Sequence, residues 1–114
     1  MKTQNKQDSP ELVAHMKEFE INAKEIYDEM TALAVRKQHD YGPKNILAYG
    51  LKGVIVRMGD KMARLDQLVW RRESSSVLEE KLEETYKDLA NYCMISIMLL
   101  RNKWPKAGTE LANK

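Results

Sequence analysis

The chain has 114 residues, with 19 lysines or arginines and 17 aspartates or glutamates, and its formal net charge of +2 gives little bulk attraction for nucleic acid. Apolar residues make up 43%, which excludes a disordered chain, and the single cysteine, Cys93, excludes an internal disulfide and favours a reducing compartment. Because the N-terminus has no apolar segment and no apolar run reaches the roughly 20 residues of a membrane span, we expect a cytoplasmic protein without a signal peptide or a membrane helix.

The first predicted element is a long helix from about Pro10 to Lys37. Ser9 suits the N-cap of this helix, and Pro10 suits its first position. Apolar residues then recur in alternating steps of four and three, which draws one stripe along a helix: Leu12, Met16, Phe19, Ala23, Ile26, Met30 and Leu33. The pair Gly42-Pro43 predicts the end of the helix, and residues 44–50 fit either a helical turn or a loop.

The second predicted helix runs from about Leu51 to Arg71 and carries two stripes. The apolar stripe consists of Leu51, Ile55, Met58, Met62, Leu65 and Val69. The charged stripe, at spacings of three, one and three, consists of Arg57, Asp60, Lys61 and Arg64, which should share a face beside the apolar one. Gly53 and Gly59 are costly inside a helix, so we expect them to permit close packing or the approach of a ligand.

The third predicted helix runs from Val77 to about Lys103 and ends at Trp104-Pro105. Ser76 and Glu79 match a capping box at its start. Its apolar face widens beyond Leu89 and includes Cys93, which we therefore expect to be a packed core thiol. Three helices of one chain do not easily cover such a face, so a dimer or higher homo-oligomer is expected.

The elements together predict an all-α fold. We expect a helical bundle of three main helices plus a short connecting helix or loop. It should form a single domain over residues 1–114, with a core at about 10–104 and frayed tails.

Glu84 and Asp88 form the first candidate for chemistry. They lie four residues apart, so both carboxylates reach one side of the third predicted helix, where a hard cation such as Mg²⁺ would relieve their repulsion. The alternative is a solvated helix face whose acids pair with nearby Lys81 and Lys87.

Two further segments could bind a nucleotide. Three cations of the charged stripe could hold a polyphosphate, with Asp60 as an added metal ligand, unless they pair with the acid of their own helix or with acids of the third helix. At the end of the first predicted helix, Tyr41 could stack on a base and Asn45 could hydrogen-bond to it, although 40–43 also reads as a plain turn.

Three motifs follow one another along the chain: K-x-x-D-Y-G at 37–42, G-x-x-x-R-x-x-D-K-x-x-R-L at 53–65 and E-x-x-x-D-L-A-N-Y at 84–92. As a set, over about residues 30–100, they resemble the nucleotide modification associated domain. That domain is a branch of the MazG-like all-α nucleotide pyrophosphohydrolase superfamily and is well populated in bacteriophages. The resemblance implies a helical bundle in a dimer or tetramer and a nucleotide ligand. In active members it also implies Mg²⁺-dependent cleavage of a nucleoside triphosphate to the monophosphate and pyrophosphate.

The resemblance also implies roles for individual residues. Asp60, Glu84 and Asp88 would be the catalytic acids that hold one or two Mg²⁺ ions. The expected contacts to the nucleotide come from Lys37, Asp40, Tyr41 and Asn45 for the base and sugar, from Arg57, Lys61 and Arg64 for the phosphates, and from Asn91. The acidic pair here is spaced E-x-x-x-D where these enzymes usually have E-x-x-D, and Arg64 stands where a companion acid is expected. An arginine there favours phosphate binding over metal binding.

The sequence leaves several functions open. The first is a Mg²⁺-dependent nucleoside triphosphate pyrophosphohydrolase. The second is a non-catalytic phage protein that sequesters a nucleotide or a cyclic nucleotide signal. The third is a plain helical oligomerisation module, and binding of DNA or RNA ranks lowest because no basic patch dominates the sequence.

Overall fold

The computed structural model describes residues 7–41, 44–71 and 75–105, and these ranges form four helices and no strand. The helices are α1 (Pro10–Tyr41), α2 (Lys44–Leu47), α3 (Gly50–Val69) and α4 (Ser76–Leu100). The prediction of an all-α bundle of three main helices is confirmed, and the short connection is a helix, α2. The predicted frayed tails lie largely outside the described residues.

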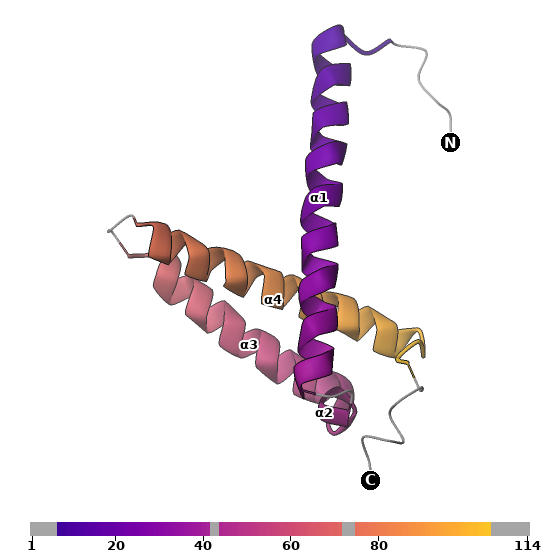
Figure 1. The fold of residues 1–114 in the computed structure, drawn as a ribbon, viewed down its shortest axis with the longest axis vertical. Coiled ribbons are helices and arrows are strands. Elements are labelled where there is room, and N and C mark those ends of the chain that lie inside the picture. The colour runs from indigo at the N-terminus through magenta and orange to yellow at the C-terminus, as the bar shows by residue number, and fades with distance from the viewer. Residues whose placement is uncertain (1–6, 42–43, 72–74, 106–114) are drawn as a thin grey trace.

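The helices are arranged as a hairpin crossed by a long rod (Figure 1). Helices α3 and α4 lie side by side, and the C-terminal half of α1 crosses α4. The N-terminal half of α1 extends away from the other helices, which gives the molecule dimensions of 59 × 44 × 22 Å. Most of the packing between helices therefore joins α3 to α4, while α1 contacts α4 at the crossing and α2 lies near the C-terminal end of α1.

A serine caps the N-terminus of each of the two longest helices. The side-chain oxygen of a capping serine accepts a hydrogen bond from a backbone N–H of the first turn, which has no partner within the helix. The N–H of Leu12 donates to Ser9 Oγ over 3.1 Å, which confirms the predicted cap of α1. For α4 the prediction of Ser76 as the cap is wrong by one residue. Ser75 has the extended backbone that an N-cap requires, and its Oγ accepts from the N–H of Leu78 over 3.1 Å.

Helix α4 ends at Leu100, three residues before the predicted end, because Asn102 adopts a left-handed conformation with φ of 56°. The N–H of Lys103 then donates to the carbonyl of Met98, and the N–H of Asn102 donates to that of Leu99. This pair of bonds is the Schellman motif, which satisfies the last helical carbonyls and reverses the chain. The reversal brings Trp104 back onto the core.

Leu65, Leu68 and Leu78 are buried along α3 and α4, and a small core cluster lies beside the crossing of α1 and α4. Ile46, Val54 and Ile95 form its centre, and the half-buried residues around them are Met58, Tyr92, Leu99 and Trp104. Gly53 permits the turn into α3, because a Cβ atom added there would lie 2.6 Å from Cβ of Tyr49. Gly50 begins α3 with φ of +59°, a conformation that glycine adopts without strain.

The predicted apolar stripe of α3 is partly wrong. The buried residues of α3 are Val54, Leu65 and Leu68. Of these, Leu65 alone belongs to the predicted stripe. The residues left exposed are Leu51, Ile55, Met62 and Val69. Val54, Lys61 and Leu68 are seven residues apart, which is two helical turns, so the side of α3 nearest α4 carries a lysine at its middle.

Two other expectations about burial differ from the structure. The apolar stripe of α1 belongs to a helix, as predicted, but no residue of α1 is buried, and Phe19 is 63% exposed. Cys93 is exposed, so the prediction of a core thiol is wrong. The reason is geometric, because Asn91 and Ile95 are the buried residues of this part of α4 and Cys93 lies two positions from each, on the far side of the helix.

Candidate functional site

A cavity of about 230 Å³ lies where the four helices meet, and we call it the cationic cavity. Seven residues predicted to contact a nucleotide or a metal line it: Lys37, Tyr41, Asn45, Arg57, Lys61, Asp88 and Asn91. The fold therefore brings residues from four separate helices to one place, although they span more than 50 positions of the sequence. The lining residues that sequence reasoning missed are Ala34, Gln38, Ile46, Tyr92 and Ile95.

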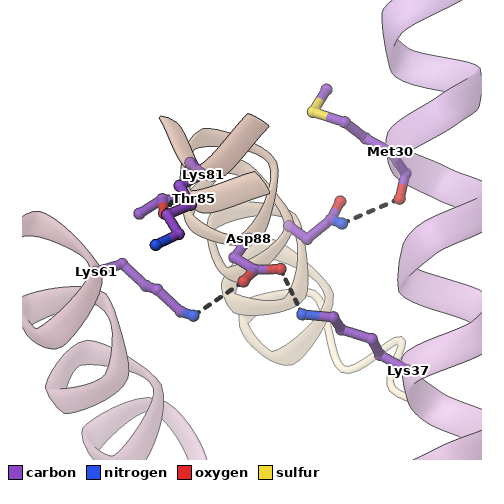
Figure 2. A network of polar contacts seen from close by, with 7 residues as sticks. Met30, Lys37, Lys61, Lys81, Thr85 and Asp88 are labelled. Atoms are coloured by element: carbon purple, nitrogen blue, oxygen red, sulfur yellow. Dashed lines mark hydrogen bonds and ion pairs between the residues drawn. The ribbon is translucent and has the colours of Figure 1, made fainter. Parts of the chain in front are cut away.

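Asp88 joins three helices at the centre of this cavity. Figure 2 shows its carboxylate on α4 between Lys37 of α1 and Lys61 of α3. Lys37 Nζ donates to Asp88 Oδ1 over 2.6 Å, and Lys61 Nζ donates to Oδ2 over 2.9 Å. The Asp88 side chain is 12% exposed, against 38% and 29% for the two lysines. Each carboxylate oxygen therefore has a cation of its own.

The charge of Asp88 is maintained by these lysines. Burial raises the pKa of the Asp88 carboxyl, but the hydrogen bonds and charges of Lys37 and Lys61 together lower it further, so that the pKa lies below its ordinary value. The carboxylate is thus ionised at neutral pH. With Arg57 also in the wall, three cations face one anion, and the excess positive charge makes the cavity suited to an anionic ligand.

Two polar contacts fix other parts of the wall. Arg57 Nη2 donates to Asn45 Oδ1 over 2.9 Å, which joins α3 to α2. Asn91 is buried, and its Nδ2 donates to the backbone carbonyl of Met30 over 3.0 Å. That carbonyl lies within α1, so its second lone pair serves the tertiary contact. Asn91 therefore positions α1 against α4 at the edge of the cavity.

Four predicted site residues lie outside the cavity lining and are exposed: Asp40, Asp60, Arg64 and Glu84. Asp60 is about 100° around α3 from Lys61, and Arg64 is about 10 Å along the helix from Arg57, beyond the end of the cavity. The side chains of Asp60, Arg64 and Glu84 form no hydrogen bond or ion pair with any described residue, and Asp40 Oδ1 lies 3.6 Å from Nδ1 of the adjacent His39.

The acids do not gather into a metal site within one chain. Over residues 7–41, 44–71 and 75–105, no group of three or more histidine, cysteine, aspartate or glutamate side chains is arranged to hold a metal ion. Both oxygens of Asp88 are bound to lysines. The donor set around the cavity therefore does not fit a hard cation, which requires several free oxygen ligands. The Mg²⁺ site at Asp60, Glu84 and Asp88 stays a prediction.

The missed lining residues gave weak signals in the sequence. Tyr92 and Ile95 belong to the apolar face of α4, where a core role is the ordinary expectation. Gln38 follows Lys37 and carries no motif of its own. Only the crossing of α1 over α4 brings Gln38 and Ile95 into one cavity wall.

Fold and site together define a small all-α protein with a cavity lined by three cationic side chains and one carboxylate. The chain belongs to the family described as "Nucleotide modification associated domain 1", whose model matches residues 37–100. The matched segment contains every residue of the cavity lining except Ala34. The family description fits a nucleotide-related role. No curated protein and no solved structure matches the chain. Among the described helices, none has the length and apolar character needed to cross a membrane.

Proposed function

We propose that this protein binds a nucleotide through its phosphate groups in the cationic cavity. The observation that carries the proposal is the convergence of Lys37, Lys61 and Arg57 on one small cavity that contains a single carboxylate. A cavity with this excess of positive charge attracts an anion of complementary size. The family description supports the choice of a nucleotide among anions.

The donors needed for phosphate remain available beside Asp88. A lysine ammonium has three N–H donors, and Lys37 and Lys61 each use one of them on the Asp88 carboxylate. Arg57 has five donors, one of which is bound to Asn45. A phosphate can therefore bind to all three cations without breaking the ion pairs that hold α1, α3 and α4 together.

The simplest function of such a site is to bind or sequester a nucleotide or a cyclic nucleotide without changing it. Binding of this kind requires no metal, and it fits a cavity whose one carboxylate is already paired with two lysines. A phage protein of this type would lower the free concentration of its ligand. It would bind equally well in the presence of a metal chelator.

The second candidate is a Mg²⁺-dependent pyrophosphohydrolase of the MazG-like superfamily, which the order of the three motifs resembles. Asp88 lines the cavity, and Glu84 precedes it by one turn of α4, which favours this candidate. A bound Mg²⁺ ion would supply charge neutralisation and an activated water. For this activity, Asp60 and Glu84 have to approach the cavity, either after the lysines release Asp88 or from a second copy of the chain.

Calorimetric titration of nucleotides, with Mg²⁺ or with EDTA, tests the proposal. We expect the variants Lys37→Met and Lys61→Met to weaken binding at least about tenfold, because each removes a charged phosphate contact. Lys52→Met is the matched control, as Lys52 is an exposed lysine of α3 that lies outside the cavity lining. Equal affinity of wild type and Lys61→Met would contradict the phosphate site.

Chromatography of the same samples separates the two candidates. Intact ligand after incubation with Mg²⁺ indicates binding alone. Pyrophosphate that forms with Mg²⁺ and not with EDTA indicates hydrolysis, and the variants Glu84→Gln and Asp60→Asn should then abolish its formation.

A further inference from the structure

A second cavity of about 490 Å³ adjoins the cationic cavity, between the C-terminal half of α1 and the end of α4. Its walls are almost entirely apolar and include Val35, Met94, Met98 and Trp104, and we call it the apolar cavity. The two cavities share Ala34, Gln38 and Ile95 in their walls, so they lie next to each other.

We propose that the apolar cavity holds the base of the bound nucleotide and that Trp104 is the residue that the base contacts. This inference rests on the proposed function, since it places one end of the same ligand. It assigns the main base contact to Trp104, which lies beyond the matched family segment, and moves the base away from Tyr41, where the sequence motif suggested it.

Volume is the first argument for an extended site. Cavities that enclose most of a small organic ligand usually measure about 300 to 1,000 Å³. The cationic cavity, at about 230 Å³, is too small for a nucleotide and large enough for its phosphates. The apolar cavity supplies the missing space directly beside it.

Chemical character is the second argument. A nucleotide has a charged end and a flat aromatic end, and the two cavities differ in the same way. The indole of Trp104 offers a large ring for stacking, and the thioethers of Met94 and Met98 adapt to the faces of a planar ligand. Stacking of bases on aromatic side chains is a common source of nucleotide affinity.

The third argument is an unsatisfied donor at the end of α4. The Nε1 atom of Trp104 is buried and has no hydrogen-bond acceptor among the described residues. A buried donor without a partner is unfavourable, so a rotation of the indole that lets it reach an acceptor is favoured. The carbonyl oxygens and ring nitrogens of a base are acceptors of this kind. The Schellman motif at Asn102 holds the tryptophan in this position.

Calorimetry with two kinds of probe tests the inference on the full-length protein. The first probe is inorganic tripolyphosphate, which has no base, and the second is a set of nucleoside triphosphates with the four common bases. The variants are Trp104→Ala and Val35→Trp, which would fill the cavity from its rim, where Val35 is 64% exposed. Trp70→Ala is the matched control, because Trp70 is 76% exposed and lies outside both cavities.

We expect Trp104→Ala and Val35→Trp to weaken at least one nucleoside triphosphate about tenfold or more and to leave tripolyphosphate within twofold of wild type. Trp104→Phe, which keeps a stacking ring, should recover part of the loss. Trp70→Ala should change neither probe. If Trp104→Ala does not fold, Val35→Trp decides the question alone, since its site is at the surface.

Three results would overturn the inference without harming the proposed function. In the first, both cavity variants bind every nucleotide with wild-type affinity. In the second, the variants lose the same affinity for tripolyphosphate as for nucleotides. In the third, Tyr41→Ala causes a base-dependent loss of affinity and Trp104→Ala does not. The first result is expected if a second copy of the chain, and not a base, fills the apolar cavity. If neither probe binds the wild-type protein, the proposed function fails and this inference fails with it.

Discussion

Lys37 Nζ donates to Asp88 Oδ1 over 2.6 Å and joins two residues that are 51 positions apart in the sequence. Helix α1 has half-buried but no buried residues, and polar contacts of this kind add to its packing against α4. In the part of the chain that the structure describes, two other side-chain hydrogen bonds join these helices, from Asn91 to the carbonyl of Met30 and from Lys87 to Glu29. The contact that shapes the candidate site is thus also one of the contacts that hold α1 against α4.

The variant Asp88→Asn should lower the free energy of unfolding by about 1 to 2 kcal/mol. It leaves Lys37 and Lys61 half-buried and without their counter-charge, and their partial exposure limits the cost. Urea denaturation at neutral pH measures the change. Glu84→Gln is the control, because Glu84 is exposed and its substitution should stay within about 0.5 kcal/mol. Equal stability of the two variants would show that the ion pairs do not hold the helices.

The same carboxylate should make stability depend on pH in the acid range. The pKa of Asp88 is lower in the folded protein than its ordinary value of 3.8, so its ionised form favours the folded state. That contribution is complete above the ordinary value and is lost as the pH falls through the lowered one. Melting temperatures between pH 7 and pH 2.5 should therefore converge for wild type and Asp88→Asn below about pH 4. A constant difference at all pH values would contradict the assignment.

Asn91 should stabilise the crossing through its hydrogen bond to Met30. Asn91→Leu keeps the size of the side chain and removes the donor, which should cost about 1 kcal/mol. Asn91→Asp puts a buried carboxylate against a carbonyl oxygen and close in sequence to Asp88, so we expect a larger loss at neutral pH than for leucine. Chemical denaturation of the two variants side by side tests this order, and the reverse order would refute the contact.

The start of α4 allows a comparison of two neighbouring serines. Ser75→Ala should lower stability by about 1 kcal/mol, because its Oγ accepts from the N–H of Leu78. Ser76→Ala lies one residue inside the helix and should have little effect. Thermal denaturation distinguishes them, and a larger loss for Ser76→Ala would restore the cap that the sequence motif suggested.

We also expect a homo-oligomer, a dimer or a tetramer. The apolar stripe of α1 is exposed in the single chain, with Phe19 and Met16 on it, and such a stripe is usually covered in a stable protein. Light scattering should give a multiple of the 13.2 kDa chain mass. The double variant Met16→Lys and Phe19→Lys should give a smaller species, whereas Glu25→Lys, on the opposite side of α1, should not. A monomeric wild type would contradict the prediction.

Much of the fold and part of the site could be predicted from the sequence. The periodicity of apolar residues located all three long helices, because this pattern depends on the local sequence and not on how the helices pack. Local chemistry located the cap at Ser9 and the charged stripe with Arg57 and Lys61, and the family resemblance pointed to Lys37. The stripe of α3 was misassigned, because this helix has apolar residues on more than one face. The sequence alone does not show which of these faces packs against a neighbouring helix. The neighbouring helix is α4, and the face of α3 that packs against it is the one on which Lys61 binds Asp88.

The sequence by itself determined that the protein is all-α and where its long helices lie, because these follow from spacing along one helix at a time. The motif resemblance added a set of polar residues as candidates for the site. Only the tertiary structure decided which of them meet. The crossing of α1 over α4 joins Lys37 to Asp88 and leaves Glu84, Asp60 and Arg64 at the surface. It also creates the apolar cavity beside Trp104. Angles between helices depend on contacts between residues far apart in sequence, and no local pattern contains them.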